Sequence, residues 1–234
     1  MVRFEVTESV GTVVAKAPAT SRVFERHGID YCCGGMVALG LACAGKGLDV
    51  ARVLAELEAE VATRPAGRDW TAASPGELID HILATHHEFV KRELPRLDTL
   101  MTKVHRVHGD AHPETLPEMA RLWGQVSGEL RPHLMKEEQI LFPAIRALAE
   151  GRPGGMPPAW LEGPIGVMEQ EHEEVGAQLA RMRELSGGYV APEGACGSWR
   201  ALWSGLDEFE QDLHRHIHLE NSVLHPAARR LAGI

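Results

Sequence analysis

Two stretches of the chain carry a histidine and a glutamate in the same order and at the same spacing. HLMKEEQILFPAIRAL begins at His133, and HIHLENSVLHPAARRL begins at His216. When the two are aligned from these histidines, Glu137 falls opposite Glu220. A histidine and a glutamate four positions apart lie on one face of a helix, where both can bind the same metal ion.

A second pair of segments repeats a single histidine. HEFVKREL from His87 and HEEVGAQL from His172 share His, Glu, Val and Leu in register. The sequence therefore contains two copies of one helix pair, and each copy supplies a lone histidine and a His-x-x-x-Glu. The six candidate ligands are His87, His133, Glu137, His172, His216 and Glu220.

All six residues fall on apolar stripes with the spacing of a bundle seam, in which the positions advance alternately by three and four residues. The stripe of the second copy is Leu206, Phe209, Leu213, His216, Glu220, Val223 and Ala227. The first copy has the stripe Trp123, Val126, Leu130, His133, Glu137, Ile140 and Ala144. The lone histidines lie on the stripes Leu83, His87, Val90, Leu94, Leu97, Met101 and Ile165, Met168, His172, Val175, Leu179, Met182.

Imidazoles and carboxylates at one depth in an apolar core are costly to bury without partners. Metal ligation removes this cost, because it uses neutral imidazole and carboxylate directly. The alternative is a set of separately hydrogen-bonded histidines with protonated or ion-paired glutamates. We favour the metal centre, because the repeat brings all six residues to the core.

The repeat predicts two ions. Each copy would supply two imidazoles to one ion, and Glu137 and Glu220 would bridge both. Imidazole and carboxylate ligands in a bundle core favour iron, and zinc or manganese is also compatible with these ligand types. We expect two non-haem irons, bridged by the glutamates and by an oxo or hydroxo group.

The remaining histidines beyond the linker lie off the stripes or have no counterpart in the repeat. His86 is adjacent to His87 but about 100° round the helix. We expect all of them at the surface or at helix ends: His81, His86, His105, His108, His112, His214, His218 and His225.

Helical periodicity dominates the chain and predicts an all-α fold. Four long segments, 76–108, 114–150, 159–186 and 196–232, predict an antiparallel four-helix bundle. Shorter helices are expected at 9–17, 20–27, 36–45 and 49–62. The stretch TRPAGRDWTAASPG, which begins at Thr63, reads as a linker. The predicted organisation is a small helical domain (1–65) with paired cysteines, a linker (66–75) and the bundle (76–234).

The paired cysteines lie in DYCCGG, which begins at Asp30. A disulfide between neighbouring cysteines requires a strained ring, so we expect two thiols. Gly34 and Gly35 would form a turn with positive φ, and a helix from about Met36 would present its amino end to the thiols. That placement would lower a thiol pKa and raise its reactivity. The plain alternative is a turn that holds small residues.

Bulk composition limits the partners. The 234 residues carry a formal charge of −9 and no run of Lys or Arg, which argues against nucleic acid. No apolar stretch reaches 18 residues, which argues against a membrane protein. The amino terminus carries Glu5 and Glu8 where a signal peptide needs an apolar run, so we expect a cytoplasmic protein.

The motifs together resemble a known family. IDYCCGG, followed by HHEFVKRELP, HLMKEEQILFP, MEQEHEEVG and HIHLENSVLHP, is similar to the bacterial iron–sulfur cluster repair proteins, also called the repair-of-iron-centres family. The resemblance implies a hemerythrin-like bundle in a cytoplasmic, stress-responsive di-iron protein that helps to restore clusters damaged by nitric oxide or peroxide. It also implies a small domain that carries Cys32 and Cys33, and two further glutamates near the iron, Glu129 and Glu171.

Three functions are compatible with these features. The leading hypothesis is an iron store that donates iron to damaged iron–sulfur proteins, with Cys32 and Cys33 as a redox or iron-transfer station. The second is an oxidoreductase that reduces nitric oxide to nitrous oxide. The third is a hemerythrin-like carrier or sensor of oxygen or nitric oxide. Whether the chain is an enzyme stays open, with the repair factor favoured, and a homodimer is compatible with the sequence.

Overall fold

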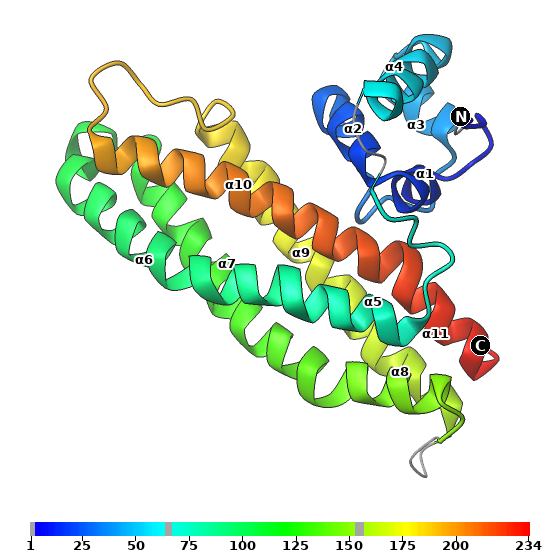
Figure 1. Ribbon diagram of the computed structural model, residues 1–234. Coiled ribbons are helices and arrows are strands. Elements are labelled where there is room, and N and C mark those ends of the chain that lie inside the picture. The colour runs from blue at the N-terminus through cyan, green and yellow to red at the C-terminus, as the bar shows by residue number, and fades with distance from the viewer. Residues whose placement is uncertain (1–2, 64–66, 153–156) are drawn as a thin grey trace. The chain divides into compact units, whose positions relative to one another are not determined.

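The computed structural model describes residues 3–63, 67–152 and 157–234. Residues 64–66, which include the predicted boundary between the small domain and the linker, lie outside the described residues. The described part of the chain consists of helices and connections, with one isolated bridge between Ser9 and Ala38 and no strand. The all-α prediction is therefore confirmed (Figure 1).

By its contacts the chain divides into two units. The first unit consists of Met1–Asp80, Ile145–Glu162 and His214–Ile234, and the second of His81–Ala144 and Gly163–Leu213.

Four short helices form the amino-terminal part of the first unit: α1 (Val10–Lys16), α2 (Ser21–His27), α3 (Leu39–Gly45) and α4 (Val50–Thr63). Ser9 caps α1, because its hydroxyl accepts a hydrogen bond from the Thr12 amide at 3.2 Å. Gly28 ends α2 in the left-handed conformation, with φ +61°. Their apolar faces enclose a core that includes Phe24 and Leu57.

The long helices match the four predicted segments to within three residues. The first comprises α5 (Pro75–Ile82), η2 (Leu83–His87) and α6 (Glu88–His108), and the second α7 (Leu116–Lys136), η4 (Glu137–Leu141) and α8 (Phe142–Ala149). The third comprises η5 (Pro158–Leu161) and α9 (Glu162–Leu185), and the fourth α10 (Gly197–Leu219), η6 (Glu220–Leu224) and α11 (His225–Ala232). Figure 1 shows α6, α7, α9 and α10 side by side, as expected for the bundle. Among the described residues, no helix combines the length and the apolar character needed to cross a bilayer.

Three of these segments, η2, η4 and η6, are π-helical turns of five residues, whereas the apolar stripes predicted regular α-helix there. A π turn holds one more residue than an α turn and is frequent at functional sites. Pro143 and Pro226 follow η4 and η6 closely. Because proline has no N–H and its ring collides with the carbonyl four residues earlier, it disfavours the regular α ladder at these two places.

The extra residue of each π turn shifts the buried stripe by one position. After Glu137 the core receives Leu141, which is 1% exposed, whereas the predicted Ile140 is 50% exposed. After Glu220 the core receives Leu224 in place of the predicted Val223. The predicted stripes are therefore correct up to each glutamate and wrong by one residue beyond it.

Candidate metal centre

All six predicted ligands are buried, with exposures between 0% and 3%. Three of them lie at the π turns, since His87 ends η2 while Glu137 and Glu220 begin η4 and η6. His133 and His172 project from the regular helices α7 and α9. The wider backbone of the π turns therefore occurs where the chain places candidate ligands.

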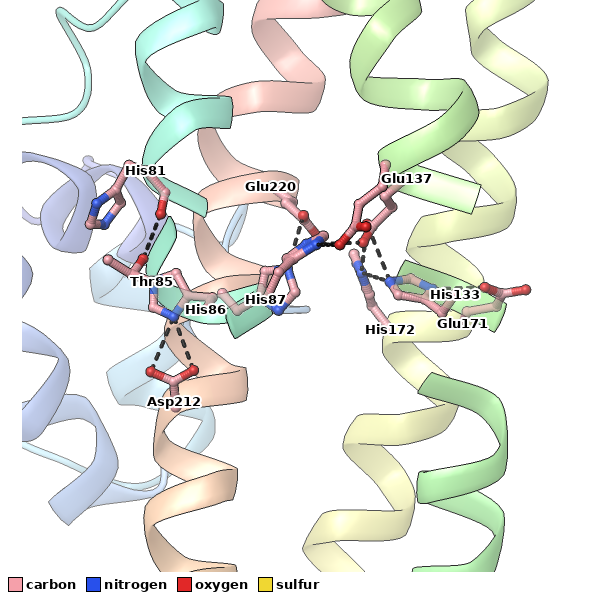
Figure 2. A network of polar contacts seen from close by, with 12 residues as sticks. His81, Thr85, His86, His87, His133, Glu137, Glu171, His172, Asp212 and Glu220 are labelled. Atoms are coloured by element: carbon pink, nitrogen blue, oxygen red, sulfur yellow. Dashed lines mark hydrogen bonds and ion pairs between the residues drawn. The ribbon is translucent and has the colours of Figure 1, made fainter. Parts of the chain in front are cut away.

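Glu137 faces two groups of imidazoles, one with each carboxylate oxygen. Its Oε1 lies 3.2 Å from His133 Nε2 and 4.0 Å from His172 Nε2. Its Oε2 lies 3.4 Å from His87 Nε2. Figure 2 shows Glu137 between His87 on one side and the pair His133 and His172 on the other. Two ligand atoms that are each about 2.1 Å from one ion, at a right angle, are about 3 Å apart. The spacing therefore suits a carboxylate that bridges two ions.

The second carboxylate repeats the contact with the histidine four residues earlier, since Glu220 Oε1 lies 3.0 Å from His216 Nε2. Two groups of four potential ligands share both glutamates, and within each group one ligand atom per residue lies within 4.8 Å of all the others. One group contains His87 and His216, and the other His133 and His172.

This grouping differs from the expectation that each repeat copy supplies both imidazoles of one ion. Each group takes one histidine from each copy. The reason is the order of helices in the bundle, because α7 and α9 are consecutive long helices and bring His133 and His172 to a separation of 3.1 Å between their Nε2 atoms.

Carboxylates outside the centre fix the orientation of two imidazoles. His87 Nδ1 donates a hydrogen bond to Glu138, and His133 Nδ1 donates one to Glu171, each at 2.8 Å. An ionised carboxylate only accepts, so Nδ1 carries the hydrogen and the lone pair of Nε2 points inward. This arrangement is typical of metal-binding histidines and raises their basicity as ligands.

Lysines keep both outer carboxylates ionised. Lys91 Nζ lies 2.7 Å from Glu138, and Lys136 forms an ion pair with Glu171. Partial burial raises the pKa of each glutamate, but the hydrogen bonds from lysine and histidine outweigh it and lower the pKa below its ordinary value. Glu138, Lys91 and Lys136 were not among the predicted site residues. The position of Glu138 directly after the candidate ligand Glu137 could have indicated its role.

The two glutamates implied by the resemblance have different surroundings. Glu171 contacts His133 as described. Glu129 is exposed, accepts a hydrogen bond from Gln178 at 3.1 Å and belongs to neither group of potential ligands. The structure therefore brings Glu171, and not Glu129, into direct contact with a candidate ligand.

Comparison with known proteins finds a cation-binding domain over the bundle. Residues 78–228 match the family model described as "Hemerythrin HHE cation binding domain", and residues 6–61 match "Domain of Unknown function (DUF542)". Proteins named "Iron-sulfur cluster repair protein YtfE" from Citrobacter koseri, Escherichia coli and Escherichia fergusonii are each 40% identical to the chain over 226 residues, which is 97% of this chain and 97% of each relative. The chain belongs to the iron-sulfur cluster repair protein family.

Three histidines of this family member are buried, although they were expected at the surface or at helix ends. His86 Nδ1 lies 3.0 Å from Asp212 Oδ2 (Figure 2). His218 packs edge-on against Tyr31, with ring centroids 5.6 Å apart, and burial lowers the pKa of His218 to about 4. His225 follows the π turn η6 and is fully buried. The expectation was wrong because the ring of Tyr31 covers His218, and because the shift of register at η6 turns His225 inward.

The paired-cysteine turn, Asp30–Gly35, uses its glycines differently from the prediction. Neither Gly34 nor Gly35 has a positive φ. A Cβ on Gly35 would lie 2.8 Å from the Tyr31 carbonyl oxygen and would collide with Ser222. The glycines are therefore not needed for a left-handed turn. They are needed because the lack of a Cβ lets backbone and side chains approach closely.

The expected activation of a thiol is not found at Cys32 of this member of the iron-sulfur cluster repair family. Helix α3 begins at Leu39, three residues later than predicted, so its amino end does not adjoin Cys33 in sequence. The hydrogen bond to Cys33, burial and the neighbouring charges raise the pKa of the Cys32 thiol well above its ordinary value. A raised pKa leaves less thiolate, so without a bound metal ion Cys32 is a weaker nucleophile than a free cysteine.

Proposed function

We propose that this chain is a di-iron protein that repairs iron–sulfur clusters damaged by nitrosative or oxidative stress, and that it does so by donating iron. The observation that best supports this proposal is the position of Glu137, whose two carboxylate oxygens lie 3.2 Å from His133 and 3.4 Å from His87. One carboxylate can then serve two ions. The name of the relatives, iron-sulfur cluster repair protein, suggests the class of client, which is damaged iron–sulfur proteins.

The donor set fits iron in this role. Four neutral imidazoles and two carboxylates suit ferrous and ferric iron better than the hard cations magnesium and calcium, which prefer oxygen ligands alone. Two irons held there would supply exchangeable metal, together with positions at which nitric oxide or oxygen could bind. Cytoplasmic location and these two gases as ligands belong to the same proposal.

In this proposal the outer and the buried glutamates have different roles. Glu138 and Glu171 hold the imidazoles of His87 and His133 with their lone pairs inward, so that these ligands need no reorganisation when an ion enters. The buried glutamates Glu137 and Glu220 supply the negative charge that balances the ions. Because only two carboxylates are shared between two ions, each ion has few anionic ligands. We expect this sharing to make the iron exchangeable.

The paired cysteines are part of the proposal as a station for redox chemistry or for iron transfer. Asn221, which follows Glu220, donates a hydrogen bond to the carbonyl oxygen of Cys32 at 3.4 Å. This hydrogen bond joins the cysteine turn to the π turn η6, which begins with the candidate ligand Glu220. This contact supports a role for the turn in handling iron that leaves the centre.

The experiment is transfer of labelled iron. The protein is loaded with an iron isotope under anaerobic conditions and mixed with a dehydratase whose cluster has been damaged by nitric oxide. We expect label to appear in the dehydratase as its activity returns, and we expect His172→Ala to transfer much less. Recovery of activity without transfer of label would refute donation. Nitrous oxide formation without transfer would favour the nitric oxide reductase instead.

A further inference from the structure

The side chain of Asp30 organises the turn that carries the paired cysteines. Its Oδ1 accepts hydrogen bonds from the amides of Cys32 and Cys33 at 2.9 and 3.0 Å, and its Oδ2 accepts one from the amide of Gly34 at 2.9 Å. Three backbone donors therefore hold one carboxylate at the centre of the turn. These hydrogen bonds fix the carboxylate beside both thiols.

The two sulfur atoms are spaced as ligands of one tetrahedral ion would be. Cys32 Sγ lies 3.8 Å from Cys33 Sγ and 3.2 Å from Asp30 Oδ1. Two thiolates bound at about 2.3 Å to a tetrahedral ion are about 3.8 Å apart. One ligand atom from each of Asp30, Cys32 and Cys33 lies within 4.8 Å of the other two.

We propose that Asp30, Cys32 and Cys33 bind a single thiophilic divalent cation at a site of their own, in addition to the ions of the bundle. Two sulfur ligands select a softer metal than the imidazole and carboxylate centre does. Asp30 is exposed and Cys33 is half-buried, so one side of the site is open to an exchanging ligand. That openness suits an ion that passes through the site rather than a permanent structural ion.

The turn is held against η6 by small residues. Gly11 and Gly35 both lie so close to Ser222 that a Cβ on either would collide with its hydroxyl. Asn221 adds the hydrogen bond to the Cys32 carbonyl. The proposed site therefore packs against the π turn that begins with the candidate ligand Glu220. If the passing ion is ferrous iron, which rests on the proposed function, this contact is where iron leaves the bundle.

The test uses cobalt(II) alone as the probe, added without oxygen to the full chain already loaded with iron. We expect about one cobalt per chain, with the absorption band of thiolate bound to cobalt. Cys32→Ser with Cys33→Ser should abolish the band, while Cys196→Ser should keep it. Asp30→Asn retains an oxygen that can accept from the amides of Cys32 and Cys33 but loses the charge, and we expect cobalt to bind more than about tenfold more weakly.

The possible results separate the proposals. Absence of a thiolate band in the parent, or a band that survives the double cysteine substitution, would overturn the site. Affinity unchanged in Asp30→Asn would remove Asp30 from it. The iron absorption of each variant, recorded before cobalt is added, reports whether the bundle is intact. Iron transfer can fail while cobalt still binds at the turn, so failure of the proposed function and failure of this site are distinguishable.

Discussion

His133 and Glu171 form a hydrogen bond from helix α7 to helix α9, with 2.8 Å between Nδ1 and the carboxylate. This bond fixes which nitrogen of His133 faces the centre. We therefore expect Glu171→Ala to weaken metal binding by roughly 10- to 100-fold, because such outer partners usually contribute that much. Competition with a chelator measures the affinity. Glu129→Ala is the matched control, since Glu129 is exposed and bonded to Gln178. Equal losses in the two variants would refute the role of Glu171.

The π turn η4 predicts that Leu141 contributes more to stability than Ile140. Regular helical spacing predicts the opposite order. Leu141→Ala removes a side chain that is 1% exposed and should lower the free energy of unfolding by about 2–5 kcal/mol. Ile140→Ala removes one that is 50% exposed and should change it by less than about 0.5 kcal/mol. Urea unfolding of both variants, each loaded with metal, measures the difference. A larger loss for Ile140→Ala would show that the helix continues without the extra residue.

Gly35 is predicted to tolerate no side chain. A Cβ there would lie 2.8 Å from the Tyr31 carbonyl oxygen, so Gly35→Ala should lower the free energy of unfolding by about 1–3 kcal/mol. Gly45→Ala is the control, because nothing lies within 4 Å of the added Cβ and alanine favours helix. Thermal unfolding compares the two variants. Equal melting temperatures would indicate that the cysteine turn does not pack as described.

The carboxylate of Glu77, at the start of α5, should make the stability of the fold depend on pH under acidic conditions. Ser74 and Glu77 form a capping box, and the amide of Ser74, Arg68 and the Ser74 hydroxyl lower the pKa of Glu77 to about 2. A carboxylate with a lowered pKa in the folded state stabilises the fold above its unfolded pKa of about 4.3. This stabilisation disappears as the pH falls toward 2. Glu77→Gln should therefore melt earlier than the parent at pH 7 and equally near pH 2. A difference that is constant with pH would contradict the assignment.

The helices and the candidate ligands could be predicted because both depend on local periodicity. The repeat identified His87, His133, Glu137, His172, His216 and Glu220, and the apolar stripes placed them in the core. The π turns could not be found in this way, because a single extra residue leaves the composition of a stripe unchanged. Only the burial of Leu141 in place of Ile140 reveals it.

Other features depended on contacts between distant parts of the sequence. The burial of His218 depends on Tyr31, which is far from it in the chain. The pairing of His87 with Glu138 joins two different helices, and no spacing within one helix encodes it. The composition of the cysteine turn predicted its location, but not the role of Asp30, because that role depends on hydrogen bonds from three backbone amides that only the folded turn brings together.

The central claim is that two irons share Glu137 and Glu220. The most direct measurement is the iron content of the purified full chain together with its Mössbauer spectrum, recorded for the parent and for Glu137→Ala. We predict two irons per chain that are magnetically coupled in the oxidised parent, consistent with the two groups of ligands, and we predict loss of this coupling in the variant. A parent that binds one iron or none, or two irons without coupling, would contradict the account.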